Sequence, residues 1–375
     1  MKNLLIVNQS ANYLMEDIAR AFKYSGKYEK VVLMVGNPEN VDSVKDIGIE
    51  VVGMYPYKRT SFKSRFKSWV IGAIQIVQKV RRNFKDYELF LVSNPPTIHL
   101  LPYFCKNKYS ALVYDVYPEG IVTGNFVTEK NIIYKIWSRL AKYFYKRAQH
   151  VYVISEGMAE RLERNCESDK IEIVPLWYNN QINRVEKEEN LFIKQHGLKD
   201  YFIVLYSGNL GKDSNISILV DLALKCKEVE HIKFVVIGEG MEKQAIIDKA
   251  KQLELSNILF LPYQPADFLS HSLSSADLAY VSVNVEGAKD CVPSKTFNLL
   301  NVETPLLCVA SPDSEIAKII KRYDVGQCFD PSKLEDMSSF VIDMAQNPEK
   351  LTNYKDNVKK AKMNFSSANA RKFSV

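Results

Sequence analysis

Two glycines and a lysine in the segment Tyr206-Ser207-Gly208-Asn209-Leu210-Gly211-Lys212 could bind a phosphate group. The segment follows an expected strand and precedes an expected helix. Glycines let the backbone approach a phosphate, and helix N-terminal amides together with Lys212 would supply positive potential. The spacing is not that of a Walker loop. An ordinary strand-to-helix turn contains the same kinds of residue, so this segment alone favours neither interpretation.

A second candidate anion site lies in residues 286–298, where Asp290 precedes Pro293-Ser294-Lys295 and Asn298 follows. Pro293 suits the first position of a helix, so the amides of Ser294 and Lys295 would be unpaired donors. Ser294 and Asn298 are four residues apart, so their side chains can lie near one ligand. An anion would therefore meet a helix dipole, free amides and a lysine together. The alternative is a well-capped surface helix.

Two weaker loops carry Gly238-Glu239-Gly240 and Pro262-Tyr263. The first is half of a dinucleotide-binding fingerprint and is more often a simple turn. In the second, Tyr263 could meet a flat base, although a loop that packs Tyr263 on its own domain explains it better. All four loops follow successive expected strands of one sheet, so a single extended ligand would account for them together.

The elements that must position these loops are short β-branched or aromatic runs alternating with helical stretches, the pattern of mostly parallel sheets covered by helices. The polar stretch 176–197 separates two such series and is expected to contain the connection between two domains and the start of the second domain. Ligands of doubly wound sheets bind at the carboxyl ends of the strands. The expected strands are 4–7, 31–35, 50–52, 89–92, 111–116, 150–154 and 171–174, then 202–206, 234–237, 258–260, 278–281, 306–309 and 327–329.

The length and composition fit a globular protein of two domains. The chain has 375 residues, of which 46% are hydrophobic and 25% charged, enough for two cores of roughly 180 residues each. The six cysteines and five histidines form no metal-binding cluster, and there is no Asp-x-Asp motif, so no metal or other cofactor is expected. With no signal peptide and no spanning segment in sight, we expect a cytoplasmic protein.

The first half is basic, with 26 Lys/Arg against 18 Asp/Glu in residues 1–180, while residues 181–375 have 24 against 26. In the segment 58–69, Phe62, Phe66 and Trp69 recur at helical spacing between lysines and arginines. Such a helix could lie on an anionic membrane surface, or it could face the core with solvated lysines. Nucleic acid is not expected as a partner, because no nucleic-acid-binding module accompanies these charges.

Taken together, four motifs resemble the family-four glycosyltransferases with the GT-B fold, in particular the subgroup similar to bacterial N-acetylfucosamine transferases of surface polysaccharide assembly. Residues 206–212 are similar to that subgroup's phosphate loop, and residues 292–298 to its Pro-Ser-Lys helix start. Residues 114–119, Tyr-Asp-Val-Tyr-Pro-Glu, are similar to its Asp-Leu-Trp-Pro-Glu segment, preceded by Ser-Asn-Pro-Pro at 93–96. The likeness extends over nearly the whole chain.

The resemblance implies two Rossmann-like, doubly wound α/β domains that face a cleft. Residues 1–178 would bind the acceptor, residues 198–355 would bind the nucleotide sugar, and the tail 356–375 would cross back to the first domain. The implied reaction is a retaining transfer of a sugar, of hexosyltransferase type, from a nucleotide diphosphate sugar to a lipid-linked or polysaccharide-precursor acceptor. The protein would then be peripheral on the inner face of the cell membrane. An epimerase of the same fold, or a catalytically inactive binding protein, is the alternative.

The resemblance also implies roles for single residues. Lys212 and Lys295 would stabilise charge on the leaving diphosphate, and Asp115 would orient the acceptor hydroxyl, although a structural turn at Pro118 explains Asp115 nearly as well. Donor contacts would come from Gly208, Asn209, Gly211, Gly238, Glu239, Tyr263, Pro293, Ser294 and Asn298. Asp290 and Asn298 stand where the wider family has two glutamates, and Glu303 stands where it has a glycine.

Overall fold

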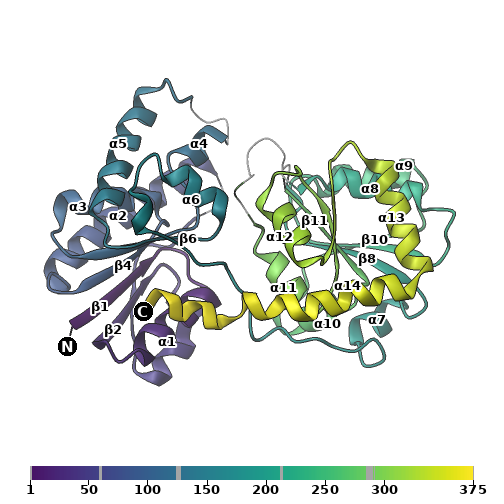
Figure 1. Ribbon diagram of the computed structural model, residues 1–375, viewed down its shortest axis with the longest axis horizontal. Helices are drawn as coiled ribbons and strands as arrows, with labels where there is room; N and C mark the ends of the chain where they lie inside the picture. The colour runs from purple at the N-terminus through teal and green to yellow at the C-terminus, as the bar shows by residue number, and fades with distance from the viewer. Residues whose placement is uncertain are drawn as a thin grey trace. The chain divides into compact units, whose positions relative to one another are not determined.

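The computed structural model describes residues 2–58, 61–123, 128–211, 214–283, 290 and 292–374. The chain forms two compact units: Met1–Pro175 with Ser367–Val375, and Leu176–Ser366. Each unit has its own parallel sheet with helices on both faces (Figure 1).

The first unit has a seven-stranded parallel sheet in the order β3-β2-β1-β4-β5-β6-β7. Its strands are β1 (Lys2–Asn8), β2 (Tyr28–Val35), β3 (Glu50–Gly53), β4 (Glu88–Val92), β5 (Tyr109–Val113), β6 (Val151–Val153) and β7 (Ile171–Ile173). Its α-helices are α1 (Tyr13–Tyr24), α2 (Phe62–Asn83), α3 (Leu101–Phe104), α4 (Glu119–Thr123), α5 (Ile132–Arg147) and α6 (Glu156–Leu162). Short 3-10 helices are η1 (Pro38–Ile47), η2 (Pro96–Leu100), η3 (Ser168–Lys170) and η7 (Ser367–Ser374).

The second unit has a six-stranded parallel sheet in the order β10-β9-β8-β11-β12-β13. Its strands are β8 (Phe202–Ser207), β9 (Ile232–Ile237), β10 (Ile258–Leu261), β11 (Leu278–Ser282), β12 (Leu306–Val309) and β13 (Gly326–Phe329). Its α-helices are α7 (Leu191–His196), α8 (Ile216–Lys225), α9 (Lys243–Gln252), α10 (Leu269–Ser274), α11 (Lys295–Asn301), α12 (Glu315–Tyr323), α13 (Leu334–Gln346) and α14 (Pro348–Ala361). Two 3-10 helices are η5 (Ala266–Phe268) and η6 (Lys362–Phe365).

Every strand expected from the sequence is present, so the expectation of two parallel sheets is confirmed. The reason is visible in β1, where residues 4–8 are all buried. A parallel sheet covered on both faces needs apolar side chains on both sides of a strand, which gives short continuous apolar runs. Such runs are the signal that the sequence carries.

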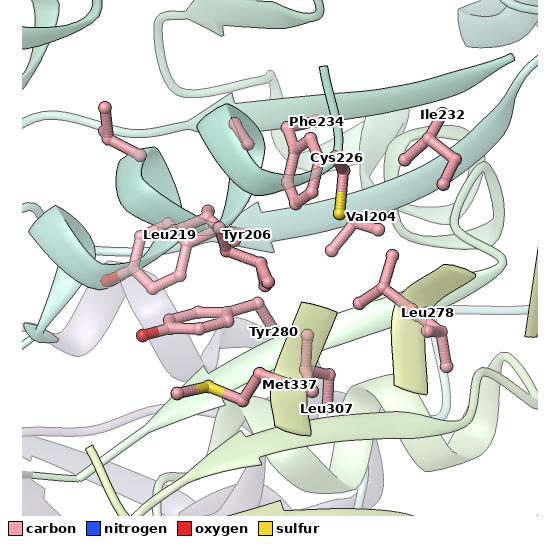
Figure 2. Packing of buried hydrophobic residues seen from close by; sticks show 14 of the residues in the cluster. Val204, Tyr206, Leu219, Cys226, Ile232, Phe234, Leu278, Tyr280, Leu307 and Met337 are labelled. Atoms are coloured by element: carbon pink, nitrogen blue, oxygen red, sulfur yellow. The ribbon is translucent and has the colours of Figure 1, made fainter. Parts of the chain in front are cut away.

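The core of the second unit surrounds two tyrosines at the centre of its sheet, Tyr206 on β8 and Tyr280 on β11 (Figure 2). Their rings meet edge to face, with centroids 6.1 Å apart. Each hydroxyl donates to a backbone carbonyl, Tyr206 to that of Asn209 at 2.6 Å and Tyr280 to that of Asn215 at 3.0 Å. Burying a tyrosine hydroxyl costs little free energy when it keeps a hydrogen bond. The bond from Tyr206 to Asn209 also fixes the loop that follows β8.

The stretch 176–197, expected to contain both the connection between the domains and the start of the second, belongs to the second unit. Side chains of α10 bind its backbone: Ser270 Oγ accepts from the Asn183 amide at 3.1 Å, and Ser274 Oγ from the Val185 amide at 3.0 Å. Buried Asn190 caps α7 and donates to the His271 carbonyl at 2.8 Å. The segment is polar because side chains and backbone groups satisfy one another there, rather than because it is a free linker.

The chain returns to the first unit at Ser367. Helix α14 and η6 stay in the second unit, where Phe365 packs on Phe297 with ring centroids 5.1 Å apart. In η7, Phe373 meets Phe90 and Tyr152 at 5.5 and 4.9 Å. Figure 1 shows this end of the chain, in yellow, beside α1 in purple. The part that joins the first unit is therefore shorter than the expected tail of residues 356–375.

Among the described residues, no helix combines the length and apolar character that a membrane crossing requires. The same part of the chain contains no group of three or more His, Cys, Asp or Glu side chains arranged to hold a metal ion.

A buried histidine in the first unit makes folding depend on pH. Trp137 donates through Nε1 to His99 Nδ1 at 3.1 Å, and His99 Nε2 lies 3.2 Å from the Tyr145 hydroxyl. Burial lowers the pKa of His99 to about 3. Below pH 6.5, the ordinary pKa of histidine, His99 binds a proton in the unfolded chain but stays neutral in the folded protein. Stability is therefore complete above that pH and falls by about 1.4 kcal/mol per pH unit as the pH drops toward 3.

We expect His99→Asn to remove most of this slope in urea unfolding at mildly acid pH, because asparagine can accept from Trp137 without titrating. His231→Asn, at an exposed histidine, is the control. Equal slopes in the wild type and in His99→Asn would show that His99 does not carry the effect.

Candidate functional site

The loops that carry the predicted donor residues lie at one edge of the second sheet. Strands β10, β9, β8 and β11 are neighbours and run in parallel, so the loops that follow them share the carboxyl edge. The backbones of the loops after β8 and β9 interlock: the Gly208 amide donates to the Ile237 carbonyl at 3.0 Å, and the Leu210 amide to the Glu239 carbonyl at 2.8 Å. The grouping that the sequence suggested is therefore present.

Gly238 and Gly240 are required by this interlocking. Both have positive φ, 154° and 159°. A Cβ atom on Gly238 would lie 1.9 Å from the Gly208 carbonyl oxygen, and one on Gly240 would lie 2.3 Å from the Leu210 carbonyl oxygen. Neither position can hold a side chain unless the backbone moves. The two glycines thus let one loop pack directly on another.

Lys295, the first residue of α11, places its ammonium group against the loop after β8. Its Nζ lies 3.9 Å from the centroid of the Tyr206 ring, and a Cβ on Gly208 would lie 3.3 Å from the same Nζ. Lys295 as a whole is half-buried, but desolvation of its ammonium end lowers the pKa to about 7. In the part of the chain that the structure describes, no carboxylate pairs with it. A bound anion would strongly stabilise this desolvated cation, and the glycine backbone beside it leaves room for one.

The Tyr206 ring supports this cation. Its face carries negative potential, so the ammonium above it is partly compensated. The ring cannot turn away, because its hydroxyl is bonded to Asn209 and its edge packs on Tyr280. Burial raises the pKa of Tyr206 to about 12, so the hydroxyl stays protonated and keeps donating. Sequence reasoning did not assign Tyr206 to the site; its place at the end of a strand beside a glycine is the one signal that could have done so.

Glu239 and Tyr263 lie together at the same edge. The Tyr263 hydroxyl is 3.5 Å from the Glu239 carbonyl oxygen, and the Glu239 carboxylate pairs with Lys243 at 2.6 Å. The Tyr263 side chain is 51% exposed, so the ring can stack on a flat ligand. Asn209 is exposed and Gly211 is half-buried in the neighbouring loop.

The start of α11 differs slightly from the expectation. Pro293 does not occupy the first helical position, because the helix begins at Lys295 with Ser294 as the N-cap residue. A turn precedes the helix, in which the Thr296 amide donates to the Pro293 carbonyl at 2.9 Å. Ser294 is exposed, and its side chain makes no capping bond.

Two residues predicted to take part in catalysis, Lys212 and Asp290, lie in or beside residues outside the described ranges. Lys212 itself is outside them, as are residues 284–289 and Cys291. Asp290 is described and half-buried. The expected roles of Lys212 and Asp290 therefore stay predictions.

Asp115 lies in the first unit, beside a cavity of about 270 Å³ at the carboxyl edge of that sheet. Ser93 positions its loop, because Ser93 Oγ accepts from the amides of Tyr114 and Asp115 at 3.0 and 3.3 Å. The lining residues come from the ends of β4 and β5, from α2 and from the loop before it: Tyr57, Arg65, Trp69, Ser93, Asn94, Pro96, Asp115 and Tyr117. Sequence reasoning singled out residues 93–96 and Asp115 but missed the aromatic wall.

That wall places Trp69 inside the first unit. Its ring stacks on Tyr57 at 6.3 Å and meets Tyr117 edge to face at 6.0 Å, and only 5% of Trp69 is exposed. Of the two alternatives for residues 58–69, a membrane face or a core-facing helix, Trp69 fits the second, because it faces the cavity. Phe66, one turn earlier, is exposed. Arg59, Thr60 and the Phe62 side chain lie outside the described residues.

A larger cavity of about 450 Å³ lies at the opposite edge of the same sheet, where the strands begin, and is lined by Lys2, Glu88, Ser110 and His150 among others. It contains none of the predicted residues. Ligands of parallel doubly wound sheets bind at the other edge, so we place the site beside Asp115 and not here.

Residues 188–361 match the family of glycosyl transferases group 1. This segment, which makes up most of the second unit, belongs to these family-four glycosyltransferases. WbjE of Pseudomonas aeruginosa, named as a glycosyltransferase, is 24% identical over 232 residues, 61% of this chain and 58% of WbjE. WcaI of Escherichia coli K12, named for colanic acid biosynthesis, is 27% identical over 210 residues, 53% of this chain and 51% of WcaI. The chain thus spans little more than half the length of these relatives.

The fold of the chain is GT-B. HepE of Anabaena, solved in complex with UDP, superposes with a TM-score of 0.72 at 13% identity, covering 100% of this chain and 98% of HepE. The same protein has also been solved with UDP-glucose. At this level of identity the likeness shows the fold alone.

Two family-four positions in which this chain departs from the pattern have structural explanations. Asn298 has a structural role: its Oδ1 accepts a hydrogen bond from the Asn179 amide at 2.9 Å and so connects α11 to the stretch 176–197. Glu303 has a φ of 64°, a conformation that favours glycine, which stands there in the family. Its carboxylate pairs with Lys362 at 2.7 Å and with Lys359 at 3.9 Å, which offsets part of the backbone strain.

The interlocked loops give a stability prediction for Gly238. Gly238→Ala should destabilise the protein by about 3 kcal/mol or more, because the new Cβ meets a backbone oxygen that cannot be displaced cheaply. Gly197→Ala is the matched control: its φ is 64° but nothing lies within 4 Å of the added Cβ. It should cost only about 1–2 kcal/mol. Chemical unfolding of both variants measures the difference, and equal losses would mean that the close approach of the loops does not matter.

Proposed function

We propose that this protein is a retaining glycosyltransferase that moves a sugar from a nucleotide diphosphate sugar to an acceptor in the assembly of a cell-surface polysaccharide. The observation that carries the proposal is the ammonium of Lys295, desolvated against Gly208 at the edge where all donor loops meet. A buried cation without a carboxylate partner in the described ranges is costly unless an anion completes it. A diphosphate supplies that anion.

In the proposed reaction the protein orients the substrates and stabilises charge on the leaving group. The bond between the anomeric carbon and the diphosphate oxygen breaks, the acceptor oxygen bonds to the anomeric carbon, and the acceptor proton passes to the leaving phosphate. Lys295 would meet the negative charge as it grows on that phosphate, together with Lys212. Gly208, Asn209, Gly211 and Ser294 would bind the diphosphate through backbone amides. No metal ion takes part in this proposal.

The base and ribose would lie toward Gly238, Glu239 and Tyr263, where the exposed Tyr263 ring offers a stacking surface. We propose a uridine diphosphate sugar as the first donor to test, since the GT-B neighbour HepE is bound to UDP and to UDP-glucose. The sugar would lie near Asp290 and Asn298, the positions of the two family glutamates.

The acceptor would bind in the first unit, in the cavity beside Asp115. Tyr57, Trp69 and Tyr117 provide ring faces of the kind that pack against the apolar face of a sugar, and Arg65 adds a cation at the same cavity. Asp115 would accept a hydrogen bond from the attacking hydroxyl and so fix its direction. A lipid-linked sugar fits this proposal, since an amphiphilic acceptor needs a sugar pocket and a separate place for its lipid.

Lys295→Met is the sharpest test of the donor site. UDP at one hundred times its Kd should stabilise the wild type by about 2.7 kcal/mol, which raises the Tm by several degrees. The variant should lose this shift, yet be no less stable without ligand, because the cost of burying an ammonium is gone. Lys251→Met, at an exposed lysine of α9, is the control. A full shift in Lys295→Met, or none with any nucleoside diphosphate in the wild type, would refute the donor site.

Titration of Lys295 adds a second readout to the same experiment. With a pKa of about 7, the side chain is an ammonium below that pH and a neutral amine above it, and a bound anion favours the ammonium. UDP affinity should therefore fall as the pH rises above 7, by up to about tenfold per pH unit. In Lys295→Met this fall should be absent in calorimetric titrations.

Asp115→Asn tests the acceptor site separately. We expect a loss on the order of a hundredfold in kcat/KM for the acceptor, with an unchanged Tm shift on binding UDP, because Asp115 lies in the other unit. Asp86→Asn, at an exposed carboxylate of the same unit, should be neutral. Chelation with EDTA should leave the rate unchanged. Release of free sugar or its isomer without acceptor would instead favour an epimerase or hydrolase.

A further inference from the structure

Helix α5 of the first unit has two apolar faces, and only one of them is covered. Its buried face consists of Ala141, Phe144 and Tyr145. The second face contains Ile132, Ile136 and Tyr143, which are 67%, 52% and 38% exposed. At about 100° per residue these three fall within an arc of ~40° on the helix surface. A helix that only supported the core would need one apolar face, so the second requires another explanation.

The exposed face continues beyond α5. Ile133, which is 55% exposed, widens it at the start of the helix. At the other end, Tyr143 packs on exposed Tyr103 of α3, with ring centroids 4.6 Å apart. We call Ile132, Ile133, Ile136, Tyr143 and Tyr103 the α5 face. Isolated exposed apolar residues are normal, but a contiguous set usually marks an interaction site.

The charges on helix α5 itself are all of one sign. Helix α5 contains Lys135, Arg139, Lys142, Lys146 and Arg147, every one exposed, and no Asp or Glu. On the same helical projection, four of these cations follow the apolar arc along one side. Arg147 lies over the Tyr143 ring at 5.8 Å. An apolar stripe flanked by cations is the arrangement of a helix lying at an anionic lipid surface.

We infer that the α5 face binds the surface of an anionic lipid bilayer, with the isoleucines in the acyl boundary and the lysines at the headgroups. This binding goes beyond the proposed sugar transfer and does not depend on it, because it needs neither donor nor acceptor. It also differs from the membrane contact expected from residues 58–69. In that segment Trp69 points into the first unit, which leaves Phe66, with Val70 and Ile74 further along α2, as the exposed apolar residues.

Nucleic acid is the less favoured partner. Phosphate backbones are bound by cations alone, and nothing in that interaction would use three exposed isoleucines. An acyl boundary uses both. Substituting the isoleucines and substituting the lysines should therefore both weaken lipid binding, whereas only the lysines should matter for nucleic-acid binding.

The test is co-sedimentation of the full-length protein with vesicles, without any nucleotide. Wild type should bind vesicles of phosphatidylcholine mixed with phosphatidylglycerol and should not bind pure phosphatidylcholine. Lys135→Ala with Lys142→Ala should weaken binding about thirtyfold, since each cation near an anionic surface contributes about a fivefold factor. Ile133→Ser with Ile136→Ser should weaken it on the order of tenfold or more.

Matched controls separate the location from the chemistry. Ile173→Ser removes an exposed isoleucine from β7 of the same unit and should leave vesicle binding unchanged. Phe66→Ser tests the α2 location. Thermal melts of all variants check that each is folded, and exposed positions should leave the Tm within a degree or two.

Two results would overturn the inference. One is wild-type affinity for anionic vesicles in the isoleucine variant, particularly if single-stranded nucleic acid bound more tightly and competed with the vesicles. The other is a concentration-dependent dimer, seen by light scattering, that disappears in the isoleucine variant while vesicles are not bound. Loss of binding in Phe66→Ser alone would move the contact to α2.

Discussion

The buried ammonium of Lys295 is the constraint on which the second unit's site depends. A cation held away from water costs free energy, and the protein offsets only part of this with the face of the Tyr206 ring. The ring must therefore be fixed. Its hydroxyl bond to Asn209 and its edge contact with Tyr280 do this, and both tyrosines lie in the middle of the sheet. A buried and hydrogen-bonded pair of tyrosines at the centre of the sheet thus supports the desolvated ammonium.

The glycines of the same edge have a shared physical origin. The backbone after β8 and the backbone after β9 approach so closely that neither Gly238 nor Gly240 can carry a Cβ atom. This answers a question that the sequence left open, since Gly238-Glu239-Gly240 could have been a turn or part of a nucleotide site. A close approach of two backbones needs glycine in either case. The packing also leaves Gly208 free of side chains where Nζ of Lys295 arrives, so the loop geometry and the site cannot be separated.

The sheets could be predicted from the sequence because strands buried on both faces leave continuous apolar runs. How much of residues 176–197 connects the domains and how much belongs to the second could not be predicted, because this depends on partners distant in sequence: Ser270 and Ser274 bind the backbone of the stretch. Trp69 shows another limit. Helical spacing of aromatics identifies a face but not what covers that face, and here the covering group is Tyr57. Tyr206 was overlooked because a buried strand tyrosine carries no signal of chemistry.

The contrast between α2 and α5 shows how charge and apolar exposure act separately. Neither helix contains an acidic residue, so net charge alone predicts the same anionic partner for both. Charge acts over a distance and brings a protein to a surface, but it does not decide which helix rests there. That choice depends on the apolar side chains that the fold leaves uncovered. Helix α2 turns Trp69 inward toward the cavity beside Asp115 but still exposes Phe66, Val70 and Ile74. Helix α5 packs Ala141, Phe144 and Tyr145 into the core and exposes three isoleucines and Tyr143, which adjoins exposed Tyr103 of α3. The α5 face therefore has more exposed apolar side chains beside its cations than α2 has.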